Sequence, residues 1–296
     1  MKYRYILSIV LAGACLSACH DFRDDHMVED TVYLRSESDA LVQDFSVYDA
    51  VSRFGVIKSG KGRSAATVTL GVAPTDSVLK YNELHKTNYL PLGRSFYNAD
   101  ELDGKVVNFA AQEARAKVDV SWDPRTMVAE MQAGADDYVI PVYIKEASID
   151  ISKTKYMVLI HPVLSTLSVR AQDNAMTCKE ASTFTGKVGL LLSNPIPGHD
   201  VRVKLAYTPE TATVAGLSYE AAPEGAIKLV TDEVTIKAGN TEVDVEVDLD
   251  MNPVAAATQR VSGKISIVSV TVMAGEGLDF MPVTSSDMIV RVTKTK

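Results

Sequence analysis

The side chains that could carry out acid–base, nucleophilic or metal chemistry are scattered along this chain. The histidines show no H-E-x-x-H or other paired spacing that would bring two imidazoles to one metal ion. They are His20, His26, His85, His161 and His199. The densest series of carboxylates, from Glu242 to Asp248, alternates with valines, which is typical of the solvent-facing side of a half-buried strand. We therefore expect no metal and no cofactor.

No group of residues resembles an active site either. A glycosidase needs two carboxylates at a fixed separation, one of them with a raised pKa, and alternation along a strand supplies neither condition. Cys178 has only Lys179 as a basic neighbour, so we interpret it as a small buried hydrophobic residue and not as a nucleophile. The segment Gly60-Lys61-Gly62 is expected to be a turn and not a phosphate loop. The sequence predicts that the protein is not an enzyme.

Sugar binding needs fewer special groups, because a sugar ring can lie flat against an aromatic side chain while polar groups meet its hydroxyls. Two aromatic residues are candidates for glycan contact, Tyr97 and Trp122. Tyr97 belongs to an expected loop and is the more plausible exposed platform of the two. Trp122, the only tryptophan, shares its parity with Val118 and Val120. An inward position in the core is therefore at least as well supported for Trp122.

The elements that would position these residues are mostly strands, because the prevailing period of the sequence is two. In the first half of the chain the expected strands are residues 31–34, 45–48, 66–72, 117–122, 138–144 and 156–160. Residues 75–85 instead space their apolar side chains so that they cover one face of a helix. We predict a short helix there.

The strand pattern of the first half recurs in the second half. Residues 117–123 correspond to residues 242–248, an offset of 125 between Val118 and Val243. The other matching pairs are 66–70 with 201–205, 139–144 with 263–268 and 157–160 with 288–291. An offset of this size is too long for a solenoid repeat and is typical of tandem domains. We therefore predict an all-β chain with two tandem immunoglobulin-like β-sandwich domains, at residues 30–165 and 166–296.

The start of the chain is typical of an export signal. Lys2 and Arg4 precede an apolar run that is shorter than the roughly 20 residues of a membrane-spanning helix. The run ends in a lipobox, Leu16-Ser17-Ala18-Cys19. We predict a lipoprotein signal peptide at residues 1–18, lipidation of Cys19 and a flexible acidic stalk at residues 19–29. Cleavage at Cys15 and a signal without lipidation are the alternatives.

Charge and cysteine content restrict the partners of the mature chain. The full chain has a formal net charge of −8, and removal of the signal takes away Lys2 and Arg4, so the mature chain carries −8 − 2 = −10. Such a surface repels nucleic acid and anionic lipid headgroups, so we expect no nucleic acid and membrane attachment through the lipid anchor alone. With Cys15 removed and Cys19 acylated, Cys178 has no partner for an intrachain disulfide.

One long segment of the first half resembles a known family. Residues 80–92 contain a Tyr-Asn followed by a Thr, a Tyr and a Leu-Pro, and a strand ending at Trp122 and the segment 138–142 follow. This arrangement is similar to the immunoglobulin-like N-terminal domain of unknown function in Bacteroidota surface lipoproteins, which often precedes a family 18 endo-β-N-acetylglucosaminidase or another glycan-handling domain. The resemblance extends over residues 28–165 and is weak in residues 166–296. It implies a lipoprotein associated with glycan uptake and does not imply catalysis.

Two hypotheses for function follow. The first is a non-catalytic lipoprotein, lipid-anchored in the outer membrane and facing the cell exterior, that binds or presents a glycan beside an outer-membrane uptake complex. The acidic run at residues 21–25 resembles the surface-export signal of Bacteroidota lipoproteins and supports this orientation, although a periplasm-facing orientation stays open. The second is a structural or adhesive lipoprotein that assembles through protein–protein contacts at sandwich edges, starting with the strands from Thr31 to Tyr48.

Overall fold

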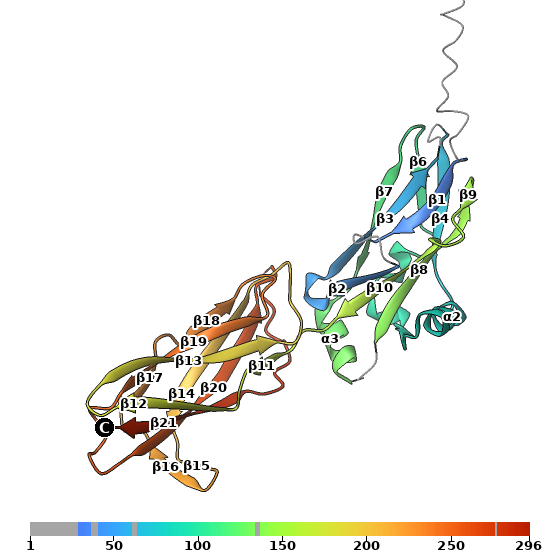
Figure 1. The fold of residues 1–296 in the computed structure, drawn as a ribbon. Coiled ribbons are helices and arrows are strands. Elements are labelled where there is room, and N and C mark those ends of the chain that lie inside the picture. Colours follow the sequence, from blue (N-terminus) through green and yellow to red (C-terminus); the bar gives the residue numbers. More distant parts are fainter. Residues whose placement is uncertain (1–28, 37–40, 61–63, 134–136, 276) are drawn as a thin grey trace, which may run out of the picture.

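Strands form most of the regular structure of this chain (Figure 1). The computed structural model describes residues 29–36, 41–60, 64–133, 137–275 and 277–296. The predicted signal peptide, the lipidation site Cys19 and the stalk, apart from Glu29, lie outside the described residues. Within these ranges no helix has both the length and the apolar character that crossing a membrane requires.

The first half of the described chain folds into two facing sheets, which we call the first sandwich. Its strands are β1 (Thr31–Arg35), β2 (Val42–Ser46), β3 (Val51–Ser59), β4 (Ala66–Val72), β5 (Leu90–Pro91), β6 (Val106–Phe109), β7 (Arg115–Ser121), β8 (Tyr138–Ala147), β9 (Asp150–Ile151) and β10 (Met157–Val163). Its helices are α2 (Thr75–His85), α3 (Pro124–Ala133) and the 3-10 helices η1 (Val47–Asp49), η2 (Arg94–Phe96) and η3 (Ala99–Glu101). One sheet has the strand order β7-β3-β1-β9, and the other has the order β2-β10-β8-β4-β6 with β5 beside β8.

The second half forms another pair of sheets, the second sandwich. Its strands are β11 (Leu167–Val169), β12 (Asp173–Lys179), β13 (Thr183–Leu192), β14 (Val201–Pro209), β15 (Ala212–Val214), β16 (Leu217–Ala221), β17 (Ile227–Leu229), β18 (Glu233–Ile236), β19 (Glu242–Asp250), β20 (Arg260–Val272) and β21 (Asp287–Thr295). One sheet has the order β11-β13-β19-β17, and the other has the order β12-β21-β20-β14-β18, with β16 beside β20 and β15 beside β16. In β19 the alternate residues Val245, Val247 and Leu249 are buried while the carboxylates between them face solvent, as the alternation predicted.

Both sandwiches begin with a chain that changes sheets. In the first sandwich β1 pairs antiparallel with β3, and β2 then pairs parallel with β10 in the opposite sheet. In the second sandwich β11 pairs antiparallel with β13, and β12 then pairs parallel with β21. This switch of the first strand between the two sheets is a feature of immunoglobulin-like sandwiches.

The strand correspondences that the sequence predicted occupy equivalent places in the two sandwiches. Strands β7 and β19 each pair with the third strand of their sandwich, β3 and β13 respectively. Strand β8 lies between β4 and β10, and β20 likewise lies between β14 and β21. The prediction of an all-β chain with sandwich architecture is confirmed. The domain boundaries at residues 30–165 and 166–296 stay a prediction.

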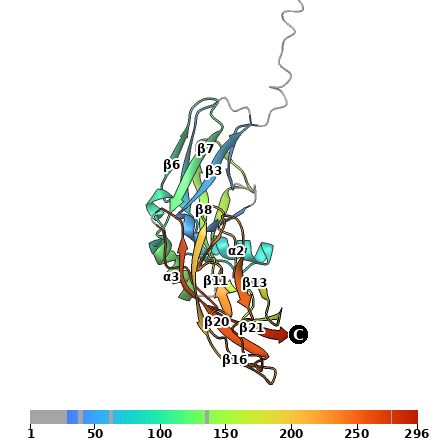
Figure 2. The same cartoon turned by 90° about the vertical axis from the view of Figure 1, so that its left-hand side faces the viewer.

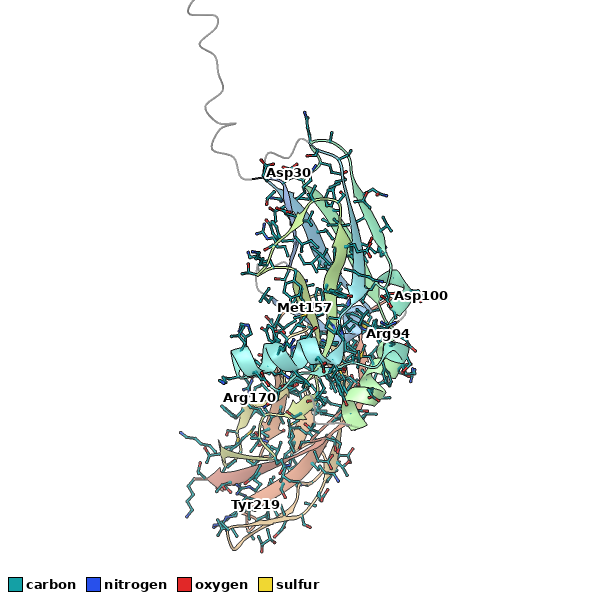
Figure 3. The ribbon with its side chains drawn as sticks, turned by 90° about the vertical axis from the view of Figure 1, so that its right-hand side faces the viewer. Asp30, Arg94, Asp100, Met157, Arg170 and Tyr219 are labelled. Carbon is teal, nitrogen blue, oxygen red and sulfur yellow. The ribbon has the colours of Figure 1, made fainter. Side chains whose placement is uncertain are left out.

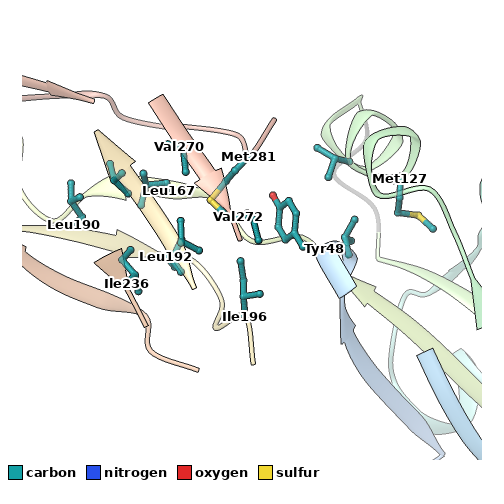
Figure 4. Close-up of a cluster of buried hydrophobic side chains, with 14 of the residues drawn as sticks. Tyr48, Met127, Leu167, Leu190, Leu192, Ile196, Ile236, Val270, Val272 and Met281 are labelled. Carbon is teal, nitrogen blue, oxygen red and sulfur yellow. The ribbon is translucent and has the colours of Figure 1, made fainter. Parts of the chain in front are cut away.

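The two sandwiches lie end to end and share a continuous apolar contact (Figures 1 and 2). Tyr48, in η1, is 1% exposed, and its hydroxyl donates a hydrogen bond of 2.8 Å to the Ser165 carbonyl oxygen in the connection between β10 and β11. Its ring centroid lies 6.4 Å from that of Phe280 in the second sandwich. Figure 4 shows Tyr48 between the two groups of buried side chains, directed toward Met281. The junction is therefore packed like a core and is not an open linker.

Polar contacts surround this apolar junction. The guanidinium of Arg125, in α3, lies 4.4 Å from the centroid of the Phe280 ring and 3.3 Å from a carboxylate oxygen of Asp279. Across the junction, His199 Nε2 lies 3.3 Å from Asp49 Oδ1. Burial raises the pKa of the Asp49 carboxyl, and the nearby His199 opposes part of that increase. The contacts come from both sandwiches and hold them in one arrangement.

Candidate functional site

The two candidates for glycan contact lie close together in the first sandwich. Tyr97 and Trp122 both line a hollow of about 230 Å³, together with Phe96 and Asp123. Each of the two is nevertheless only 6% exposed. The two residues that the sequence singled out therefore lie close together, but neither ring offers a flat face to solvent. Glycan contact by Tyr97 and Trp122 stays a prediction, and their burial does not favour it.

The Tyr97 ring is buried and is not an exposed platform, because hydrogen bonds hold the loop that carries it against β7. The Asn98 amide donates to the Ser121 carbonyl oxygen at 2.9 Å, and the Glu101 carboxylate accepts from both the amide and the hydroxyl of Ser121 at 2.9 Å. These bonds turn the Tyr97 ring into the core, where burial raises the pKa of its phenol.

Trp122 occupies the core position that its parity with Val118 and Val120 allowed. Its indole N–H donates a hydrogen bond of 2.8 Å to the Val47 carbonyl oxygen, next to the junction between the sandwiches. A buried tryptophan with a satisfied N–H is typical of a structural residue.

A second and larger hollow lies beside α2. Helix α2 forms over the residues predicted to be helical, buries Val78 completely against the sheet and ends at Lys86, whose φ of 58° is left-handed. Tyr81 and His85 follow Val78 by three and seven residues and so lie on the same side of α2, with Leu84 at the edge of that side. These side chains form one wall of the hollow.

Asn82 fixes the chain directly after α2. Its side-chain N–H donates to the Tyr89 carbonyl oxygen at 2.8 Å, and its side-chain oxygen accepts from the Thr87 hydroxyl at 2.8 Å and from the Tyr89 amide at 3.1 Å. The Asn, Thr and Tyr of the sequence pattern in residues 80–92 thus form a single hydrogen-bonded turn. This turn places Tyr89 beside the helix.

Aromatic rings continue from α2 across the surface of the neighbouring sheet. The rings of Tyr81 and His85 stack with centroids 4.2 Å apart and an interplanar angle of 25°. Tyr89 lies 6.2 Å from Tyr81 and 5.3 Å from His161, both measured between centroids. His161 Nδ1 in turn lies 2.7 Å from a carboxylate oxygen of Asp44. The row ends in a polar pair that orients the last ring.

The hollow beside α2 has a volume of about 430 Å³. Its other wall is the connection leading into β10, with Tyr156 at 41% exposure, and Met157, the first residue of β10 (Figure 3). Leu84 projects at the rim and is 76% exposed. Polar groups also line the hollow and are supplied by Ser77, Lys80, Lys153 and Thr154. Aromatic faces and hydroxyl or ammonium groups therefore meet in one place.

This arrangement favours binding over catalysis. Burial raises the pKa of both the Tyr81 and the Tyr89 phenols, so each remains a neutral hydroxyl at neutral pH. In the part of the chain that the structure describes, no group of histidine, cysteine and acidic side chains could hold a metal ion. An aromatic ring face with a few polar groups around it is complementary to a sugar, which presents an apolar C–H face and hydroxyl groups. The sequence contained one signal for this site, the spacing of four residues between Tyr81 and His85 on a predicted helix.

Comparisons with solved structures give only distant likenesses. A structure of "CBD12 from CALX1.2" has 8% identity and a TM-score of 0.38, covering 88% of this chain and 99% of the other. A "putative carbohydrate binding protein" from Bacteroides ovatus has 15% identity and a TM-score of 0.35, covering 84% and 70%. A protein of unknown function from Porphyromonas gingivalis has 14% identity and a TM-score of 0.25, covering 88% and 99%. At these TM-scores the likenesses carry no argument about this chain.

A family model matches the first part of the chain. No curated protein matches this chain. The model is described as a "-like, N-terminal domain" and matches residues 28–151. This region holds α2, the Asn82 turn and the strands up to β9. It is also the region in which the sequence resembles an N-terminal domain of surface lipoproteins. Residues 28–151 are therefore similar to the N-terminal domain that this family model describes.

Proposed function

We propose that this chain is a non-catalytic carbohydrate-binding protein and that the hollow beside α2 receives a sugar ring. One observation carries the proposal. The stacked rings of Tyr81 and His85 and the half-exposed Tyr156 line one hollow of about 430 Å³, with lysine and hydroxyl groups around it. A sugar ring placed there would bury its C–H face on an aromatic ring while its hydroxyls meet polar side chains.

The site of action belongs to the same proposal. Acylation of Cys19 after cleavage of residues 1–18 would anchor the chain in the outer membrane, and the acidic residues that follow would direct it to the cell surface. The protein would then present a glycan to an uptake complex in the same membrane. Cys19→Ala should move the chain from the membrane fraction to the soluble fraction and abolish labelling by a palmitate analogue. Retention in the membrane without labelling would contradict the anchor.

The binding experiment uses the full chain and a panel of neutral oligosaccharides, measured by isothermal titration calorimetry. The variants Tyr81→Ala and Tyr156→Ala should each weaken the best ligand about tenfold, since an aromatic contact contributes about 0.5 to 1.5 kcal/mol beyond its buried area. Phe184→Ala is the matched control, because Phe184 is 50% exposed but lies in the second sandwich. Absence of binding across the panel in protein with a cooperative unfolding transition would overturn the proposal. Binding that is lost only in the control would place the site elsewhere.

The alternative function, assembly through exchanged strands, has less support from the ladders. Strand β1 is hydrogen-bonded on both sides, to β3 and to β9, and β2 pairs with β10 along five residue pairs. Tyr48, at the end of this segment, is buried in the junction. Removal of residues 31–48 would therefore open both sheets and the junction together.

A further inference from the structure

A third hollow lies on the outer face of the sheet β7-β3-β1-β9. Strands β5 and β10 belong to the other sheet of the first sandwich. The volume of this third hollow is about 260 Å³. The strand register places Arg35, Gly55 and Lys117 side by side across β1, β3 and β7. The next row toward the end of β3 places Ile57 opposite Arg115. Gly55 thus forms the floor of the hollow, with longer side chains on every side.

The hollow is strongly basic although the protein as a whole carries a formal net charge of −8. Of the described residues that line it, four are basic and none is acidic. These four are Arg35, Arg53, Arg115 and Lys117. Arg53 makes a two-pronged contact with the Asp119 carboxylate, at 2.6 Å and 2.8 Å. Within the described ranges, Arg115 and Lys117 form no ion pair.

Fold stability does not account for this grouping. Like charges on neighbouring positions of a sheet are destabilising, and a glycine inside a strand weakens it. The backbone does not require glycine at residue 55, and a Cβ there would need only a small shift of the end of the Ile57 side chain. The φ of Gly55 is not in the left-handed region, and a Cβ there would lie 3.3 Å from Ile57 Cδ1 and 3.5 Å from the Arg35 carbonyl oxygen. What glycine provides at this position is an open floor between two cations.

We propose that this hollow binds an acidic sugar, a pyranose that carries a carboxylate or a sulfate group. The guanidinium of Arg115 can form paired hydrogen bonds with a planar carboxylate or with a sulfate, and the Lys117 ammonium adds a second charge. The Ile57 side chain and the Gly55 backbone offer an apolar surface for the C–H face of the ring. Because it has different residues and a different face, this site is independent of the hollow beside α2.

The experiment measures binding of tri-galacturonate, a sulfated hexose disaccharide and methyl-esterified tri-galacturonate to the full chain by calorimetry. At least one acidic sugar should bind, and for tri-galacturonate methyl esterification should weaken binding about tenfold or more. Raising the salt concentration from about 50 to about 200 mM should weaken it further, as expected for an exposed charged site. Sodium sulfate alone and anionic lipid vesicles serve as competing ligands.

Two variants test the residues. Arg115→Gln/Lys117→Gln removes the cations without an ion pair, and Gly55→Val fills the floor, so each should weaken the acidic sugar about tenfold or more. Lys145→Gln/Lys204→Gln is the matched control, because it removes the same charge from exposed positions outside the hollow. Equal unfolding midpoints for wild type and variants show that the fold is retained; a Gly55→Val chain that unfolds early is replaced by Gly55→Ala.

The outcomes separate the alternatives. Failure of every acidic sugar to bind would overturn the proposal, as would equal losses in the control variant. If sodium sulfate displaces the ligand as effectively as the sugars do, the hollow is a site for a simple anion. If vesicles bind preferentially, it is a site for a lipid surface. Either result would overturn the proposal of an acidic sugar. Neutral oligosaccharides report on the hollow beside α2, so failure there leaves this result unaffected.

Discussion

At the scale of single residues, Asn82 does the most to position the candidate site. It joins the end of α2 to the Tyr89 backbone through two hydrogen bonds and accepts a third from the Thr87 hydroxyl, and Tyr89 in turn contacts Tyr81 and His161. Asn82 and Thr87 belong to the sequence pattern that resembles a known family. Their role in that pattern is to form the turn that follows α2. The aromatic members of the pattern extend from that turn to the surface.

Replacing Asn82 should affect stability and the site together. We expect Asn82→Ala to lower the free energy of unfolding by about 1 to 3 kcal/mol, since it removes one donor and one acceptor and leaves the Tyr89 backbone groups unpaired. Urea denaturation followed by tyrosine fluorescence measures the change. Asn88→Ala is the control, because Asn88 is exposed in the same turn. Identical midpoints for the two variants would mean that the turn does not depend on Asn82.

Single residues also show where the sequence was sufficient. The position of Trp122 followed from its parity with two valines, because a strand alternates its faces. The burial of Tyr97 could not be predicted, since η2 and η3 have no simple period and the Glu101 to Ser121 contact joins segments 20 residues apart. The hollow beside α2 was missed because its second wall, with Tyr156, comes from a distant part of the chain.

At the scale of elements, α3 connects the first sandwich to the second. It begins directly after Asp123, whose carboxylate accepts from the Arg125 amide at 3.0 Å and from the Thr126 hydroxyl at 2.8 Å. Met127 and Val128 are buried, while Arg125 reaches Phe280. The sequence predicted only a turn here, because Asp-Pro is typical both of turns and of helix starts, and the helix is short.

The start of α3 can be tested by changing its cap. Asp123→Ala should destabilise the protein by about 1 kcal/mol, because the Arg125 amide and the Thr126 hydroxyl lose their acceptor. Asp123→Ser should recover most of this loss, since serine can accept the same bonds. Thermal unfolding of the three proteins provides the comparison. A serine variant as unstable as the alanine variant would show that the carboxylate acts in another way.

Other elements were predictable to the extent that they are periodic. The bounds of α2 and the correspondence of β7 with β19 followed from spacing and alternation alone. The register that places Gly55 between Arg35 and Lys117 did not, because the sequence does not state which strands are neighbours.

At the scale of the whole molecule, the junction between the sandwiches determines whether the chain behaves as one body. Its central hydrogen bond joins the Tyr48 hydroxyl to the Ser165 carbonyl oxygen, and both groups are buried. By contrast, the buried hydroxyl of Tyr97 has no hydrogen-bond partner among the described residues. The two tyrosines therefore form a matched pair for mutation.

We expect Tyr48→Phe to lower the free energy of unfolding by about 1 to 3 kcal/mol, because it leaves the Ser165 carbonyl oxygen unpaired in an apolar setting. Tyr97→Phe should be neutral or slightly stabilising, because it removes a hydroxyl that is buried without a partner. Small-angle scattering of Tyr48→Phe should also show a wider distribution of lengths than the wild type. Equal effects of the two substitutions would show that the junction bond contributes nothing specific.

The sheet switch at the start of each sandwich has a mechanical consequence. In the first sandwich β2 and β10 run parallel as neighbours over five residue pairs, and in the second β12 and β21 do so over seven. A force that pulls the two ends of a sandwich apart would slide these strands past each other, so that it loads the hydrogen bonds of the ladder together instead of breaking them one at a time. Each sandwich is therefore arranged to bear tension along the chain, as a tethered protein pulled by a large ligand would need to do.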